Sequence, residues 1–153
     1  MSKRKVSVPE NEWEWFGDAG HFICAKDCQF HLCTKVGNYL VSTVGRRWPC
    51  RASREIHAQA YDPQWLAANR HRLGDDFDGA YMDRFGYDTV GCDREFETMV
   101  FKAGKRCASK DCGCGLPAIN GSELDFLGYN SAKDATQGHL KLCRKWAAKG
   151  RSK

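Results

Sequence analysis

The chain lacks any apolar run long enough to span a membrane, and no apolar segment follows the basic residues at its first positions. A transmembrane helix needs about 20 predominantly apolar residues, and a secretory signal needs an apolar segment after its basic start. We therefore expect a cytoplasmic protein without a membrane partner. Of the 153 residues, 42% are hydrophobic, which indicates a folded domain rather than disorder.

The common catalytic motifs are also missing. The sequence contains no phosphate-binding loop, no G-x-G-x-x-G, no H-E-x-x-H and no deaminase signature. Asn130 and His139 have a spacing loosely compatible with a ββα-metal nuclease, but no histidine lies on the strand-like segment just before them. We therefore favour a protein that is not an enzyme.

Cysteine is the unusual presence, with nine residues. An odd number cannot form a complete set of internal disulfides, and a reducing compartment does not favour them. Abundant cysteine in a cytoplasmic chain points to metal binding or to reactive thiols.

Residues 131–149 show the strongest helical pattern, with an apolar face that includes His139 and Cys143. Ser131 is a good N-cap, Asp134 completes a pair resembling a capping box, and Gly150 ends the helix. His139 and Cys143 should therefore point inward, one turn apart. A buried imidazole needs a polar partner, and a metal ion bound by both side chains would provide one.

The remaining ligands would come from a loop rich in glycine and charged residues. It contains Cys107, Cys112 and Cys114. A cysteine-rich turn facing a helical His-x3-Cys pair is the general layout of a structural zinc site. Cys107, Cys112, His139 and Cys143 are the favoured set, and Cys114 is the main substitute. The alternative is a buried histidine among core thiols.

A second constellation comprises Cys24, Cys28, His31 and Cys33. Four such residues within ten positions could surround a second Zn²⁺, although the spacing is unusual. The cysteines could equally be packed strand residues. A third interpretation is a catalytic thiol paired with a nearby histidine, but such sites are normally assembled from distant segments.

The segment 45–54 reads as a basic loop whose arginines flank a tryptophan. Arginines with an interleaved aromatic ring can bind phosphates and stack on bases. A solvated loop with a docked tryptophan is the competing explanation. The candidate nucleic-acid-binding residues are Arg46, Arg47, Trp48, Arg51 and Arg54.

The predicted fold is a single α+β domain over residues 9–149, with basic flexible tails at 1–8 and 150–153. We expect a small antiparallel sheet from segments 21–44 and 93–103, with a hairpin turn at Gly37 and Asn38. Helices from 62–85 and 131–149 would cover it, and structural zinc would stabilise it. A short helix is expected at 9–17 and another at 122–127.

These observations favour a small metal-stabilised binding protein that contacts a protein or a nucleic acid. An accessory protein of a phage or mobile element that targets a host nucleic-acid machine would have these properties. One alternative is a nucleic-acid-binding zinc module that uses the 45–54 loop. The other is a metal- or cysteine-dependent hydrolase or nuclease, which requires an open metal position or an activated thiol.

Overall fold

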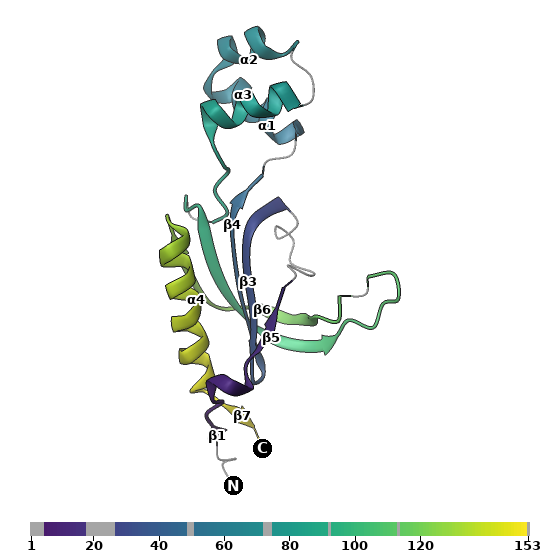
Figure 1. Ribbon diagram of the computed structural model, residues 1–153, viewed down its shortest axis with the longest axis vertical. Helices are drawn as coiled ribbons and strands as arrows, with labels where there is room; N and C mark the ends of the chain where they lie inside the picture. The colour runs from purple at the N-terminus through teal and green to yellow at the C-terminus, as the bar shows by residue number, and fades with distance from the viewer. Residues whose placement is uncertain are drawn as a thin grey trace.

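The computed structural model describes residues 5–17, 27–48, 51–71, 75–91, 93–112 and 114–152. The elements in chain order are β1 (Lys5–Val6), the 3₁₀ helix η1 (Glu10–Glu12), β2 (Glu14–Phe16), β3 (Cys28–Val36), β4 (Tyr39–Arg47), α1 (Arg51–Tyr61), α2 (Pro63–Asn69), α3 (Asp75–Phe85), β5 (Phe96–Arg106), β6 (Pro117–Tyr129), α4 (Ala132–Ala147) and β7 (Arg151–Ser152). Figure 1 shows an elongated molecule, with α1–α3 at one pole and the described ends of the chain at the other. None of the described helices is both long and apolar enough to cross a membrane.

Five antiparallel strands form the main sheet in the order β2-β3-β4-β5-β6. The predicted α+β class is therefore confirmed, and so is the hairpin turn between β3 and β4, where Gly37 has a φ of 61°. The prediction of a strand at 21–24 lies outside the described residues. The predicted short helix at 9–17 is wrong beyond η1, because β2 pairs with the edge of β3.

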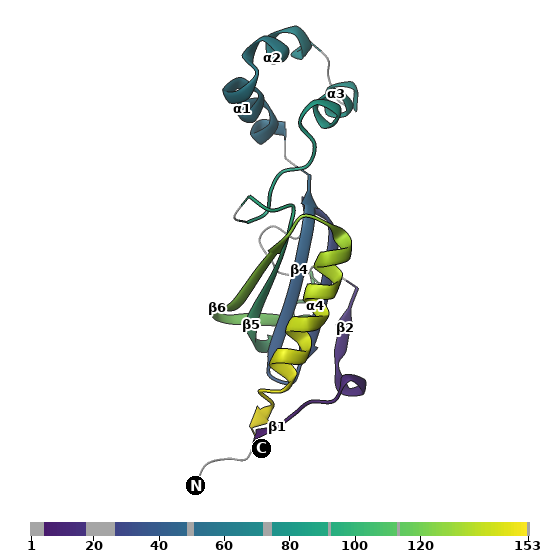
Figure 2. The same ribbon diagram turned by 90° about the vertical axis from the view of Figure 1, so that its left-hand side faces the viewer.

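Helix α4 crosses one face of this sheet (Figure 2). The Ser131 hydroxyl accepts the Asp134 N–H at 3.1 Å and donates to the Asp134 carboxylate at 2.8 Å, so the predicted N-terminal cap is confirmed. The helix and the sheet share a core that includes Val36, Val41, Val100, Leu142, Cys143 and Trp146. This core fixes the face of α4 that points at the strands.

Helices α1–α3 form an insertion between β4 and β5 with a second hydrophobic cluster, made of Ala58, Leu66, Phe77 and Tyr81. The predicted start of α2 is confirmed, because Asp62 accepts the Trp65 N–H at 3.0 Å and Pro63 is the first helical residue. The predicted loop at 45–54 is wrong at both ends, since β4 continues to Arg47 and α1 begins at Arg51.

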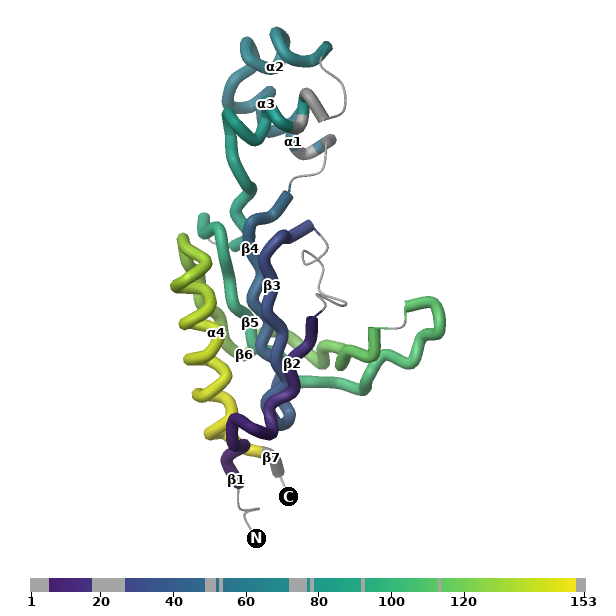
Figure 3. The backbone as a smooth tube through the Cα atoms, viewed as in Figure 1, coloured from purple at the N-terminus to yellow at the C-terminus, as the bar shows by residue number. Residues whose placement is uncertain are grey.

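Strands β5 and β6 form a long hairpin whose outer part projects from the body (Figures 1 and 3). The predicted helix at 122–127 is wrong, because these residues belong to β6. Val100 opposes Asp125, whereas Lys102 opposes Asn120, so β6 carries extra residues at this point and Gly121 adopts a φ of 90°. Asn120-Gly121 therefore lies at a bulge within a strand rather than at a turn between elements.

Residues near both ends of the described chain pair with each other. Val6 opposes Arg151 in the two-stranded β1–β7 sheet, and Val8 is buried against α4, where its N–H donates to the Ala147 carbonyl at 3.0 Å. Parts of the segments predicted as flexible tails, 1–8 and 150–153, are therefore paired or packed.

Candidate metal centre

The loop that joins β5 to β6 brings three cysteines together at the tip of the projecting hairpin. The sulfur atoms of Cys107, Cys112 and Cys114 all lie within 4.8 Å of one another. Cys112 is exposed, and the other two are half-buried. Among the described residues, no histidine or carboxylate joins this group.

The donor set suits a soft metal ion. In a tetrahedral zinc site with Zn–S bonds of about 2.3 Å, neighbouring sulfurs lie about 3.8 Å apart, so this triad needs only a small contraction to bind Zn²⁺. Zn²⁺ and Cu⁺ bind well to thiolate ligands, whereas Mg²⁺ and Ca²⁺ prefer oxygen ligands. Three thiolates would leave a fourth coordination position for water or for a group from another molecule.

The base of this loop is held by the chain itself. The Cys107 N–H donates to the Leu116 carbonyl at 2.8 Å, and the Arg106 guanidinium donates to the Gly115 carbonyl at 3.1 Å. Arg106 also pairs with Glu14 of β2 and lies 5.6 Å from the centre of the Phe16 ring. The hairpin therefore leaves the body from a fixed anchor, and the cysteines lie beyond it.

Glu14 has a second cationic partner, Lys35, at 2.8 Å. The Lys35 hydrogen bond, assisted by Arg106, lowers the pKa of the Glu14 carboxyl. Glu14 is therefore ionised at neutral pH and holds the hairpin base through Arg106.

The structure does not bring His139 and Cys143 to these cysteines. Both are fully buried between α4 and the sheet, as their helical spacing predicts. The His139 ring places Nε2 at 2.8 Å from Thr34 Oγ1 and Nδ1 at 2.7 Å from Thr43 Oγ1, and Thr43 is 2.7 Å from Thr98. Hydroxyls from two strands, β3 and β4, satisfy the imidazole for which the sequence analysis had predicted a metal partner.

Burial determines the protonation of this helix pair. It lowers the pKa of His139 to about 4, so the ring is neutral and one nitrogen donates while the other accepts. It raises the pKa of the Cys143 thiol to about 12, although a hydrogen bond with Thr34 opposes that shift. A protonated thiol is a poor metal ligand.

The second predicted site is not assembled among the described residues. Cys24 lies outside them. Cys28, His31 and Cys33 belong to β3, where side chains alternate between the two faces, so Cys28 points away from the side that carries His31 and Cys33. Cys28 and Cys33 are buried strand residues.

The predicted nucleic-acid-binding residues that are described differ in exposure, and Arg47 and Trp48 are half-buried. Arg46 is exposed, but Arg54 is only 5% exposed and lies 6.0 Å from the centre of the Tyr81 ring within the helical insertion. The Trp48 ring packs 6.2 Å from Tyr87. The side chain of Arg51 lies outside the described part. The described residues of this segment therefore do not form one exposed basic surface.

Sequence reasoning missed the three threonines around His139. The available signal was strand alternation, since a threonine at an inward position needs a hydrogen-bond partner. It also missed α1 and, with it, a cavity lined by aromatic and acidic residues.

Comparison of the chain with family models, with curated proteins and with solved structures finds no match.

Proposed function

We propose that this chain is a non-enzymatic binding protein that holds one Zn²⁺ at the tip of its β5–β6 hairpin and uses that tip to contact an anionic macromolecule. The observation that supports the proposal is the convergence of the Cys107, Cys112 and Cys114 sulfurs within 4.8 Å on a projecting loop.

The described residues of this loop contribute little to a hydrophobic core. Between Cys107 and Cys114 the described residues are small or polar, and residues 108–112 are exposed. Such a segment buries too little apolar surface to offset the entropy of ordering it. Metal–thiolate bonds can supply that free energy, as they do in small zinc-stabilised modules.

The charges along the hairpin favour an anionic partner, and nucleic acid is the partner to test first. Lys102, Lys105 and Lys110 are exposed, while Asp111 and Glu123 are the exposed acids near them. Lysines spaced along a protruding arm can follow a phosphate backbone. A sequence-independent contact of this kind needs no base-reading pocket.

The open fourth position also raises the alternative of a metal-dependent hydrolase. Such an enzyme needs a general base beside the metal-bound water. No described histidine or carboxylate joins the three sulfurs, and this favours binding over catalysis.

Metal analysis of protein purified without added metal tests the proposal. We expect about one zinc per chain, lost in Cys112→Ser and kept in Cys143→Ser, because only the first residue belongs to the loop. Absence of bound metal, or equal loss in both variants, would remove the metal centre.

Fluorescence anisotropy with labelled single-stranded DNA, duplex DNA and RNA tests the partner. We expect binding that weakens steeply with salt, and a smaller salt slope in a Lys105→Gln, Lys110→Gln double variant. The matched control is Lys133→Gln with Lys141→Gln, two exposed residues of α4. Binding that is absent or insensitive to salt contradicts a nucleic-acid partner.

A further inference from the structure

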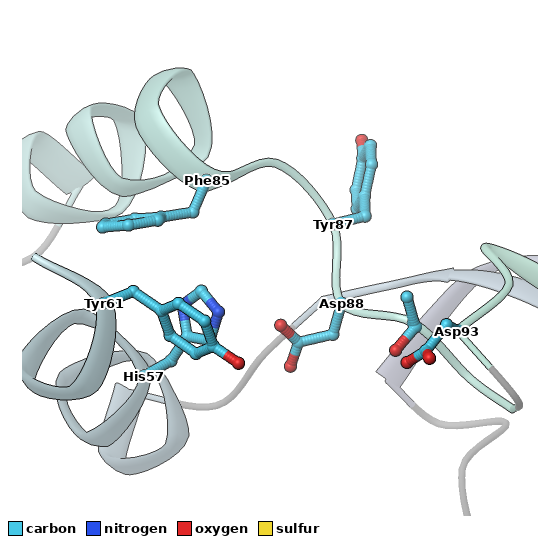
Figure 4. A pocket seen from close by; sticks show the side chains of 7 residues that line it. His57, Tyr61, Phe85, Tyr87, Asp88 and Asp93 are labelled. Carbon is cyan, nitrogen blue, oxygen red and sulfur yellow. The ribbon is translucent and has the colours of Figure 1, made fainter.

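A cavity of about 530 Å³ lies where the helical insertion meets the segment that returns to the sheet (Figure 4). Small-molecule sites are typically about 300–1,000 Å³, so it is large enough for an organic ligand and too large for a bare metal ion. Its lining residues come from α1, from the end of α3 and from the segment after it: His57, Tyr61, Phe85, Tyr87, Asp88, Thr89 and Asp93.

One wall of this cavity is aromatic and held in place. The His57 ring lies 4.6 Å from the Tyr61 ring and 5.1 Å from the Phe85 ring, measured between centroids. The buried Tyr81 hydroxyl lies 3.0 Å from His57 Nδ1, and this contact fixes the imidazole within the insertion's core. Tyr61 is 76% exposed and stands at the mouth.

The opposite wall is acidic. Figure 4 shows the Asp88 carboxylate pointing from the returning segment toward His57 and Tyr61, with Asp93 beyond it. The Asp88 N–H donates to the Arg47 carbonyl at 3.1 Å, so the end of β4 anchors this wall. The Tyr87 hydroxyl donates to Gln29 Oε1 at 2.9 Å and ties the same segment to β3.

The charged residues that line this cavity are acidic, whereas the chain as a whole is basic. The chain carries a net charge of +5, yet no described lysine or arginine lines this cavity, and Asp88 and Asp93 do. Aromatic faces and carboxylates both attract cations, and they do so best when the cation is flat or carries an apolar body.

We propose that this cavity binds a guanidinium group. Its planar cation would stack on the exposed ring of Tyr61, because the His57 ring is already in contact with Tyr61 and Phe85, while its N–H groups pair with the Asp88 carboxylate. Asp93 would add to the negative field. Thr89 offers a hydroxyl for one further hydrogen bond. The group could belong to a small guanidino compound or to an arginine side chain of a peptide, since the recognised chemistry is the same.

Isothermal titration of the full chain with agmatine and with a blocked Gly-Arg-Gly peptide tests the site and separates the two sources. Tighter binding of the peptide indicates an arginine of a protein partner, and tighter binding of agmatine indicates a free guanidino compound. n-Butylammonium should bind more weakly than either. Failure of both guanidinium probes to bind at millimolar concentration overturns the proposal.

Variants locate the binding. We expect Asp88→Asn to weaken the preferred probe at least tenfold and Tyr61→Ala to weaken it several-fold. Asp83→Asn, an exposed residue of α3 outside the cavity, should bind as the wild type does. Equal effects of Asp88→Asn and Asp83→Asn, in variants with wild-type circular dichroism, would contradict the site. The inference is independent of the metal centre, so Cys112→Ser should leave guanidinium binding unchanged.

Discussion

Two regions of this molecule carry residues that bind soft metal ions, and they differ in what surrounds them. On α4, His139 and Cys143 lie in a closed core, where the ring nitrogens contact threonine hydroxyls at 2.7 and 2.8 Å. At the hairpin tip, three cysteines converge on a loop whose residues 108–112 are exposed to solvent. In the first region threonine hydroxyls satisfy the imidazole, whereas in the second region three thiols lie close enough together to bind one metal ion.

The contrast shows that ligand type alone does not identify a metal site. Burial favours the neutral form of an ionisable group, and for Cys143 it raises the pKa of the thiol, while no third ligand-type side chain among the described residues joins His139 and Cys143. A metal site in a protein of this size is better sought where thiols converge and the local chain lacks another source of order.

The largest expected effect comes from His139→Ala. This change leaves a cavity and removes one hydrogen-bond partner from each of two buried threonine hydroxyls, Thr34 and Thr43, so we expect a loss of about 3–4 kcal/mol in the free energy of unfolding. Urea denaturation measures it. The exposed His71→Ala should change stability by less than about 0.5 kcal/mol. If His139→Ala changed the free energy of unfolding as little as His71→Ala does, the buried hydrogen bonds of His139 would not distinguish the α4 region from the hairpin tip.

The pH dependence of stability follows from the same residue. The pKa of His139 is about 4 in the folded protein and about 6.5 when the chain is unfolded. As pH falls from about 6.5 to 4, the unfolded chain gains a proton that the folded core resists, so stability decreases. The expected loss at this site is about 3 kcal/mol by pH 4.

Denaturation at several pH values, compared between wild type and His139→Gln, isolates this contribution from the other titrating groups. The variant should lack the decrease contributed by His139 between pH 6.5 and 4. Parallel curves for the two proteins would show that the ring is not held neutral.

Substitution of the buried Cys143 or the exposed Cys112 should change the free energy of unfolding of metal-free protein less than His139→Ala does. Cys143→Ser places a hydroxyl in an apolar core and should cost about 1–2 kcal/mol. Cys112→Ser, at an exposed loop position, should cost less than about 0.5 kcal/mol. Chemical denaturation in the presence of a chelator measures both.

Alkylation of the folded protein provides a second measurement on the same cysteines. Iodoacetamide should modify Cys112 rapidly and Cys143 only after unfolding, and added zinc should protect Cys112. Fast modification of Cys143 would contradict its burial.

Local signals allowed much of the fold to be predicted. Ser131 with Asp134, Asp62 with Pro63, and the Gly37 turn each involve residues only a few positions apart, so their chemistry is visible in the sequence. Strand β6 was missed because it is defined by pairing with β5 and contains a bulge at Gly121. The period-2 pattern is lost at such an irregularity.

The candidate metal ligands also separate into those that local sequence could predict and those that depend on distant contacts. The three cysteines that converge lie within eight positions of one another, and their spacing indicated a metal. The fate of His139 depended on Thr34 and Thr43, which are 105 and 96 positions away. Their approach depends on the register of the sheet against α4, which no short pattern in the sequence encodes.

The route of the chain through the helical insertion has a consequence for how such a protein can change. Gly45 of β4 and Phe96 of β5 are paired neighbours, so the chain leaves the sheet and returns to nearly the same place. The entropy of closing a loop grows only slowly with its length. Helices α1–α3 could therefore be shortened, replaced or exchanged between related chains while the sheet and α4 keep their geometry. The aromatic and acidic cavity would vary with them, whereas the cysteine hairpin belongs to the part that stays.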